Sequence, residues 1–220
     1  MMKYIYFFLG IIMLSFSCTS CDPTGANVCT RDYSFTVPVK ITPIRDTFHL
    51  GDTLQISMNF PKNMIDNSSD SFDLSAFPFN ATIDLLKIDE APFSDGPGMA
   101  SYKAITGGIN VVYFSATASE EVQIVFDKAT NLFLFSCNVI LEKKGVFDLS
   151  YQSADFFDEF NEFDFKNECR TNSVKIFYDL EADSTKTNFE LLGQSPDSQI
   201  VAITREKFDK SGGFAFVVVD

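Results

Sequence analysis

The sequence has no tryptophan, one of the two rings on which sugar-binding faces usually stack sugars, so only its seven tyrosines could serve there; it also has only one histidine, His49. A single imidazole cannot form a multi-histidine metal centre, and any serine–histidine nucleophile pair would have to use it. No serine stands in a Gly-x-Ser-x-Gly pattern, and the glycine pairs lack the strand–loop–helix frame of a phosphate-binding loop. We therefore expect a chain that is not an enzyme, with no cofactor and no metal site.

Positive charge is also scarce. Lysine and arginine number 17 against 30 aspartate and glutamate residues, which gives a net charge of −13. Such a surface repels the phosphates of nucleic acid, so we expect no nucleic-acid partner. The hydrophobic share of 45% and the charged share of 21% are typical of a globular protein, whose core 25 phenylalanines can fill.

The first residues lack charge apart from Lys3 and contain an apolar run from Tyr4 to about Phe16. This run is too short for a transmembrane helix, which needs about 20 apolar residues to cross the bilayer core. A basic start, a short apolar run and a small residue before the cleavage site are typical of a secretory signal peptide. We therefore expect residues 1–17 to be a signal peptide.

A cysteine follows this run directly. The stretch LSFSC, ending in Cys18, resembles the lipobox of bacterial lipoproteins, with Ser17 as the small residue before the cysteine. Leu14 lies one place further upstream than usual, a departure common in lipoproteins of the Bacteroidota. The resemblance implies several acyl chains on Cys18, which anchor a protein firmly because each buried methylene contributes about 0.8 kcal/mol. Cys21, preceded by Ser20, is the alternative acceptor.

The five cysteines are Cys18, Cys21, Cys29, Cys137 and Cys169. If Cys18 carries lipid, four remain, and they allow three pairings in an oxidising compartment. If Cys21 carries lipid, three remain and one thiol has no partner. Cys29 opens the folded region and Cys169 follows an acidic segment, so we predict a disulfide between these two.

Residues 18–32 are small, polar and turn-rich, and we expect a flexible tether there. From Tyr33 onward apolar residues recur at every second position, which indicates strands. The first strand contains Pro38, which cannot donate to a ladder, so we expect it at a sheet edge. Residues 61–72 are expected to be a polar loop. The expected strands are residues 33–41, 54–60, 81–88, 108–116, 120–127, 132–141 and 145–153.

Two of these stretches resemble strands of immunoglobulin-like domains in bacterial surface proteins. One is the Gly51-Asp52 turn followed by the alternating strand TLQISMNF, and the other is GVFDLSYQS, which places Phe147, Leu149 and Tyr151 inward. The resemblance implies a two-sheet β-sandwich over residues 33–153, with Tyr151 as a corner tyrosine.

The chain from residue 154 to 220 has a different pattern. Phe156, Phe160 and Phe163 are spaced like one face of a helix. A strand is expected at residues 174–181, and the final FAFVVVD is expected to be a strand buried on both faces.

A helix start is indicated further on, with Ser195 as its cap and Pro196 in its first position, and Gly212-Gly213 ends it. We expect a mainly β protein: an immunoglobulin-like sandwich with a smaller C-terminal β-rich unit, residues 154–220, carrying one or two short helices.

Three further patterns are candidate sites. The acidic run from Asp155 to Asp164 is interrupted by phenylalanines, and the loop at residues 66–71 lacks the glycine of a calcium loop, so we expect no calcium site in either. Asp52-Thr53-Leu54 and Asp183-Ser184-Thr185 resemble the O-glycosylation pattern of the Bacteroidota, which makes Thr53 and Ser184 candidate glycosylation sites. In TFHLGD, Phe48 and Leu50 are expected to point inward and His49 outward.

Taken together, the chain resembles small lipoproteins of unknown function from the Bacteroidota. This resemblance implies an outer-membrane lipid anchor and a non-catalytic binding or scaffold module, whose partners are the bilayer and an envelope protein or glycan. An alternative is a glycan-capturing accessory protein of a nutrient-uptake system. It would need exposed rings among four tyrosines, Tyr102, Tyr113, Tyr151 and Tyr178. A third candidate, a hydrolase, would need two carboxylates about 5–10 Å apart in a cleft.

Overall fold

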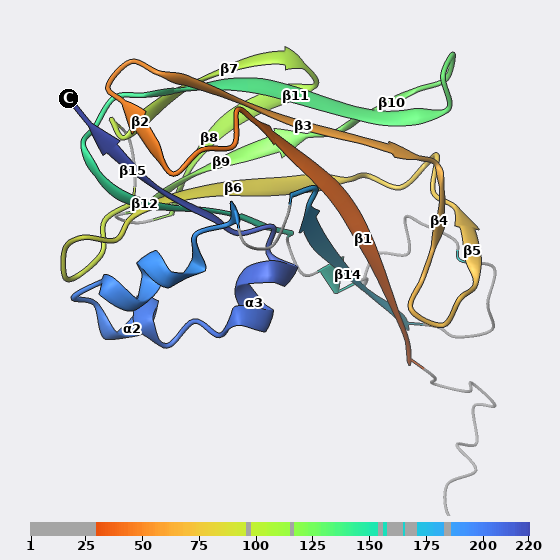
Figure 1. The fold of residues 1–220 in the computed structure, drawn as a ribbon. Coiled ribbons are helices and arrows are strands. Elements are labelled where there is room, and N and C mark those ends of the chain that lie inside the picture. Colours follow the sequence, from red (N-terminus) through yellow and green to blue (C-terminus); the bar gives the residue numbers. More distant parts are fainter. Residues whose placement is uncertain are drawn as a thin grey trace, which may run out of the picture.

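The computed structural model describes residues 30–95, 98–114, 117–153, 156–157, 165, 171–182 and 186–220. Within them two β-sheets lie face to face, and short helices cover the outer face of one sheet (Figure 1). The predicted class, a mainly β sandwich of two sheets with few short helices, is confirmed.

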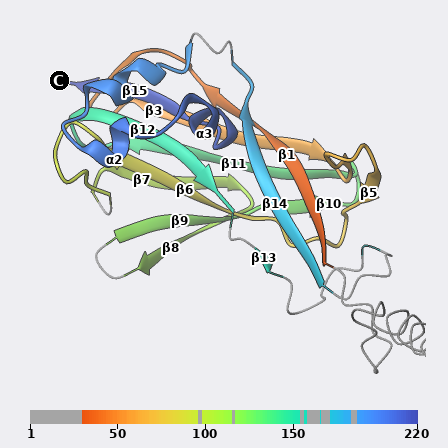
Figure 2. The same ribbon diagram turned by 90° about the horizontal axis from the view of Figure 1, so that it is seen from below.

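The first sheet, called sheet A, carries the N-terminal strand at its centre. Its order is β10 (Val125–Asp127), β11 (Leu132–Leu141), β3 (Thr53–Pro61), β1 (Thr30–Thr42), β14 (Thr171–Leu180) and β13 (Phe156–Phe157), with β7 (Ala100–Thr106) also beside β11. Neighbouring strands are antiparallel except β1 and β14, which run parallel with Val39 opposite Leu180. Figure 2 shows β1 and β14 side by side.

The second sheet, called sheet B, carries the C-terminal strand. Its order is β2 (Thr47–His49), β15 (Phe214–Val219), β12 (Gly145–Gln152), β6 (Asn80–Lys87), β9 (Thr117–Gln123) and β8 (Gly108–Phe114). The β2–β15 pair is parallel and the others are antiparallel. Tyr151, Ile83 and Glu120 follow one another across β12, β6 and β9, so they lie on the same face of the sheet.

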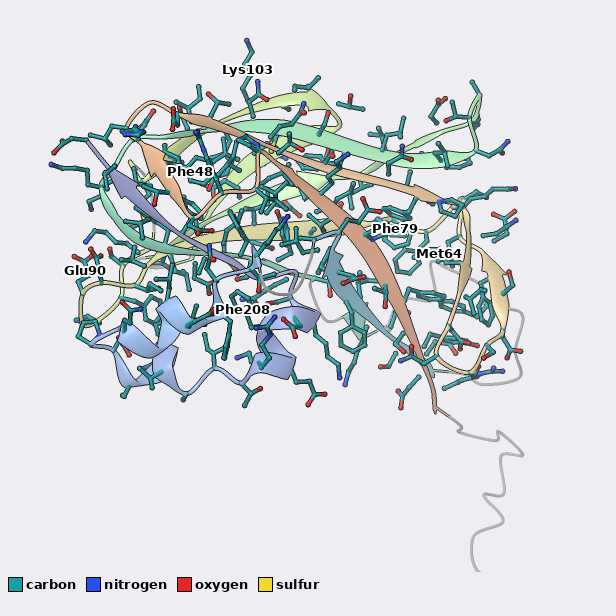
Figure 3. All side chains as sticks on the ribbon, viewed as in Figure 1. Phe48, Met64, Phe79, Glu90, Lys103 and Phe208 are labelled. Carbon is teal, nitrogen blue, oxygen red and sulfur yellow. The ribbon has the colours of Figure 1, made fainter. Side chains whose placement is uncertain are left out.

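Alternating side chains of both sheets form the main core. In β11 every second residue is buried, as the alternation predicts, and the same holds for Leu54, Ile56, Met58 and Phe60 in β3. Phenylalanine rings fill much of this space: the Phe60 ring stacks on Phe133 at 5.2 Å and meets Phe79 edge-on at 5.1 Å. Figure 3 shows Phe79 inside the sandwich, whereas Lys103 points away from it.

The position of β1 differs from the prediction. Pro38 indicated an edge strand, but β1 lies between β3 and β14. The ladder with β3 begins at Val39, one residue after the proline, and the ladder with β14 covers residues 30 to 39. Pro38 thus lies where β1 has a ladder partner on one side only, so the absent N–H leaves the β3 ladder intact.

The C-terminal part of the chain is interleaved with the sandwich. We expected residues 154–220 to pack against a finished sandwich, but β14 belongs to sheet A and β15 lies between β2 and β12 in sheet B. As predicted, β15 is buried on both faces over most of its length. At the other end of the chain, β1 begins at Thr30, so the last three residues of the predicted tether 18–32 belong to this strand.

The predicted C-terminal helix is divided into two short ones, α2 (Ser198–Val201) and α3 (Arg205–Lys210), and the 3-10 helix η2 (Phe189–Gln194) precedes them. The expected start at Ser195 and Pro196 is wrong, because Asp197 is the N-cap of α2 and accepts a hydrogen bond from Gln199 N at 2.8 Å. Thr204 caps α3 in the same way through Lys207 N at 3.2 Å. No helix in the described part of the chain is long enough to span a bilayer.

Two smaller expectations also fail. Residues 61–72 form a hairpin of β4 (Asn63–Ile65) and β5 (Ser71–Asp73) because Met64 inserts into the main core and fixes the first strand. Phe156 belongs to the short strand β13 beside β14, not to a helix. The other two members of that stripe, Phe160 and Phe163, lie outside the described residues.

Candidate functional site

The C-terminal helices cover the outer face of sheet B through a second, smaller core. Its buried residues are Ile88, Leu192, Ile200, Phe208 and Ala215. Phe208 of α3 is 1% exposed, and Figure 3 shows its side chain on the side of α3 that faces the sheet. Burying a phenylalanine side chain contributes about 1.5–3 kcal/mol, so this contact holds the short helix in place.

A single aspartate connects these helices to the loop after β6. Asp197 is buried; its Oδ1 caps α2, and its Oδ2 accepts a hydrogen bond from Phe93 N at 2.9 Å. The bond from Phe93 joins residues 104 positions apart in the sequence, whereas the cap bond from Gln199 is local. The helical cover is therefore fixed at one end by a side chain that satisfies two backbone N–H groups.

Between α2, α3 and sheet B lies a cavity of about 560 Å³. Its wall combines apolar side chains with several hydroxyl and amide groups, and it contains one carboxyl and one ammonium group. The lining residues are Leu86, Phe93, Asp148, Ser150, Gln152, Ser153, Phe177, Gln199, Ile200, Ile203, Lys207, Phe208 and Ser211. The volume and the mixed lining are typical of small-molecule sites.

The carboxyl in this wall is unusual. Asp148 of β12 is 3% exposed, and its Oδ1 has no hydrogen-bond partner among the described residues. Burial, reinforced by the negative charge of Asp84, raises the pKa of Asp148 to about 7. Asp148 therefore changes its charge near neutral pH, inside a cavity whose other lining groups include donors and acceptors.

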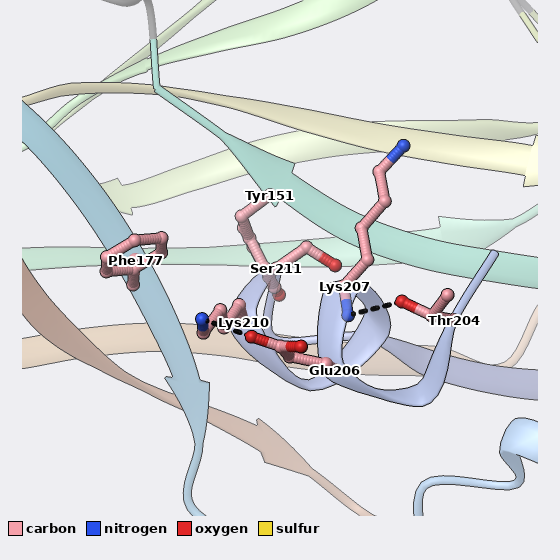
Figure 4. A pocket seen from close by; sticks show the side chains of 7 residues that line it. All are labelled: Tyr151, Phe177, Thr204, Glu206, Lys207, Lys210 and Ser211. Carbon is pink, nitrogen blue, oxygen red and sulfur yellow. Dashed lines mark hydrogen bonds and ion pairs between the residues drawn. The ribbon is translucent and has the colours of Figure 1, made fainter.

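Lys207 is the positive group of the cavity and links it to a second hollow. This second hollow, of about 330 Å³, adjoins the cavity, because Phe177, Lys207 and Ser211 line both; Tyr151 is also among its lining residues. Figure 4 shows the Lys207 side chain extending from α3 over the strands of sheet B, whereas Lys210 turns to Glu206, with an ion pair of 2.6 Å. Lys207 is exposed, so its ammonium group remains in contact with water.

The residues predicted for lipidation and disulfide formation cannot be placed. Cys18, Cys21, Cys29 and Cys169 all lie outside the described residues, so these assignments stay predictions. Cys137 is described: it is a buried free thiol in β11.

Thr53 and His49, both predicted to lie on the surface, are accessible. Thr53 is exposed at the start of β3, which is compatible with glycosylation, and Ser184 lies outside the described residues. The His49 side chain is 62% exposed and points outward as predicted, with Nδ1 3.8 Å from an Asp52 carboxylate oxygen. Leu50 is 42% exposed rather than inward, because it lies in the turn after β2.

Of the four candidate tyrosines, the three whose side chains the structure describes do not form the exposed platform that glycan capture would need. Tyr151 and Tyr178 are buried with their rings 5.6 Å apart, and Tyr102 donates a hydrogen bond to the buried Glu120. The side chain of Tyr113 lies outside what the structure describes. Tyr151 is also not a corner tyrosine, because its hydroxyl is buried without a hydrogen-bond partner among the described residues.

The acidic patterns give no metal or paired-carboxylate site in the described residues. In the loop at residues 66–71, Asp66 accepts hydrogen bonds from the backbone N–H groups of Ser68 and Asp70, which is a structural role. No group of three or more potential metal ligands gathers in the described part of the chain, and the acids of the run at residues 155–164 lie outside it. Among the described lining residues Asp148 is the one carboxyl of the cavity wall, and Asp84 is not part of that lining.

Comparisons with known proteins are distant. No model of a known protein family matches the chain, and no curated protein matches it. Among solved structures, the chain is similar to a non-cellulosomal cohesin from the hyperthermophilic archaeon Archaeoglobus fulgidus, at 8% identity and a TM-score of 0.30, over 86% of this chain and 92% of that one. It is also similar to the type II cohesin dyad from the adaptor ScaA scaffoldin of Acetivibrio cellulolyticus, at 8% identity and a TM-score of 0.28, over 66% of this chain and 46% of that one.

Proposed function

We propose that the chain is a cell-envelope lipoprotein, held on the outer membrane by lipid on Cys18, whose β-sandwich is a non-catalytic binding or scaffold module. The observation that supports the binding role is the cavity of about 560 Å³ beneath α2 and α3. Its wall holds Asp148, a buried carboxyl with one oxygen that has no hydrogen-bond partner among the described residues, and such groups are concentrated at functional sites.

The proposed anchor rests on the sequence LSFSC and on the short distance along the chain from Cys18 to the first strand. Residues 19–29 separate Cys18 from Thr30, and this stretch spans at most about 40 Å when fully extended. Figures 1 and 2 both show α2 at the opposite end of the sandwich from the first residues of β1. A lipid on Cys18 would therefore hold the sandwich near the bilayer and leave the helical cover on the far side.

Cell fractionation with two cysteine variants tests the anchor. The wild-type chain should sediment with membranes and be extracted by detergent but not by high salt. Cys18→Ser should release it into the soluble envelope fraction, whereas Cys21→Ser should leave it on the membrane. Release by Cys21→Ser alone would move the anchor to Cys21, and membrane retention of both variants and of the double variant would refute lipid anchoring at this site.

A further inference from the structure

We propose that the cavity beneath α2 and α3 binds a small organic cation, an ammonium or guanidinium group on an apolar body, with Asp148 as its counter-ion. This inference deepens the proposed binding role by naming a ligand class for the same cavity. It does not depend on the lipid anchor, because all the groups involved lie in β6, β12, the loop after β6 and the C-terminal helices.

The first argument is the state of the Asp148 carboxyl. It is almost completely buried, and its Oδ1 accepts no hydrogen bond from the described residues. A buried acceptor without a partner is costly in a folded protein, and a charge-assisted bond from a cationic donor would satisfy it. Asp148 lines the cavity of about 560 Å³, but Oδ1 itself is fully buried, so the carboxyl must turn about its Cβ–Cγ bond for this oxygen to meet a donor in the cavity.

The second argument is the charge around the cavity. Asp84 of β6 lies on the same sheet face as Leu86, the residue opposite Asp148, so a second negative charge stands near the first. Lys207 of α3 is the one cationic side chain among the described lining residues, and it is exposed and forms no ion pair with Asp148. An incoming cation is attracted by the Asp148 carboxylate, whereas an anion is repelled by it.

The third argument is the composition of the remaining wall. Five apolar side chains, Leu86, Phe93, Ile200, Ile203 and Phe208, would surround the body of the ligand. Aromatic rings also attract cations through their faces. A purely charged ion, such as an inorganic cation, would leave this apolar surface unused, so an amphiphilic organic cation fits better.

Calorimetric titration of the detergent-purified full chain with three matched probes tests the charge requirement. The probes are phenethylammonium, the neutral 2-phenylethanol and the anionic 3-phenylpropionate, each at pH 8, where Asp148 is ionised for the most part. We expect the ammonium probe to bind at least tenfold more tightly than the alcohol and the anion not to bind. Equal binding of all three probes, or no binding of the ammonium probe at millimolar concentration, would overturn the proposal.

Variants then locate the site. Asp148→Asn should weaken phenethylammonium binding at least tenfold, the loss expected when one charge-assisted hydrogen bond disappears. The matched control Asp32→Asn removes the same charge from an exposed position of β1 and should leave binding unchanged. Circular dichroism and the thermal midpoint verify that both variants fold. Equal affinity of Asp148→Asn and wild type would contradict the assignment.

Two further variants test whether Lys207 competes with the ligand and whether the ligand occupies the cavity. Lys207→Met removes the competing ammonium group and should strengthen phenethylammonium binding several-fold, while Gln199→Trp should obstruct the cavity from the exposed side of α2 and abolish binding. Weaker binding in Lys207→Met, or full binding in Gln199→Trp, would contradict the proposal. A chain that binds the probe but is not membrane-anchored would refute the anchor alone, and an anchored chain that binds no probe would refute the cation site alone.

Discussion

Tyr102 of β7 donates a hydrogen bond to Glu120 of β9, and this bond joins sheet A to sheet B within the core of the sandwich. Glu120 is 8% exposed. Burial raises the pKa of Glu120 to about 7, and the hydrogen bond from Tyr102 limits the rise. The core thus contains a carboxyl that loses its proton near neutral pH. Asp148 also loses its proton near neutral pH, but it lies on the outer face of sheet B, beneath the helices.

The raised pKa of Glu120 predicts that the protein is more stable in mild acid than in mild base. The pKa of Glu120 is about 7 in the folded state against an ordinary value of 4.5, so the folded chain holds the proton more tightly. The free energy of unfolding should therefore fall as the pH rises from about 4.5 to about 7 and then level off. Urea titrations at pH 5 and pH 8 measure this difference.

Glu120→Gln isolates the contribution of this carboxyl. The variant should be more stable than wild type at pH 8, by up to about 3 kcal/mol, and nearly equal to it at pH 5. Glu121→Gln is the matched control, because Glu121 is the next residue of β9 and lies on the opposite face of the strand. An equal gain in both variants at pH 8 would show that net charge, and not the buried carboxyl, causes the effect.

Gly107, between β7 and β8, should not tolerate a side chain. Its φ is +82°, and an added Cβ would lie 2.4 Å from the backbone oxygen of Gln123. Gly51 has the same φ but open space around it. Gly51→Ala should therefore cost only the conformational strain of about 1–2 kcal/mol, whereas Gly107→Ala should cost about 3 kcal/mol or more, or prevent folding. Thermal denaturation of the two variants compares them, and equal losses would contradict this account.

Asp197 should matter more than an ordinary helix cap. Asp197→Ala removes the cap of α2 and also leaves Phe93 N without its acceptor, so we expect a loss of about 2 kcal/mol or more. Thr204→Ala removes the cap bond of α3 alone and should cost about 1 kcal/mol. Hydrogen exchange of the Phe93 amide provides a local readout. It should accelerate in Asp197→Ala and not in Thr204→Ala, and the reverse pattern would refute the link between the loop and α2.

Cys137 should be chemically silent while the protein is folded. Burial raises the pKa of its thiol to about 12, so the reactive thiolate is scarce at pH 8 and also inaccessible. Alkylation by iodoacetamide, followed by peptide mass spectrometry, should be at least a hundredfold slower in the native protein than in denaturant. Fast labelling of Cys137 in the native state would show that β11 opens readily.

The strands were largely readable from the sequence, because one face of each faces a core. The expected range 132–141 coincides with β11, and the alternation correctly identified the buried residues of β3. The strand β7 was missed because its side chains do not alternate clearly between buried and exposed. Pro38 misled the prediction because its effect depends on where the ladder with β3 begins, which a single strand does not reveal.

The cavity could not be foreseen from β12 alone. Alternation placed Phe147 and Leu149 inward and so placed Asp148 on the other face, but it does not say whether that face meets water or helices. A signal was present elsewhere: the continuous apolar run FAFVVV of β15 indicates a strand covered on both faces, and Ala215 of that strand pairs with Asp148. Because Asp148 pairs with a strand that is covered on both faces, its side chain is expected to be buried as well.

The most direct test of the account is the intact mass of the chain extracted from membranes, with sequencing of its N-terminal peptide. We predict that residues 1–17 are absent and that Cys18 is the first residue and carries a mass increment of several acyl chains. A chain that begins elsewhere, or that begins at Cys18 without lipid, would contradict the central claim that this sandwich is a lipid-anchored binding module.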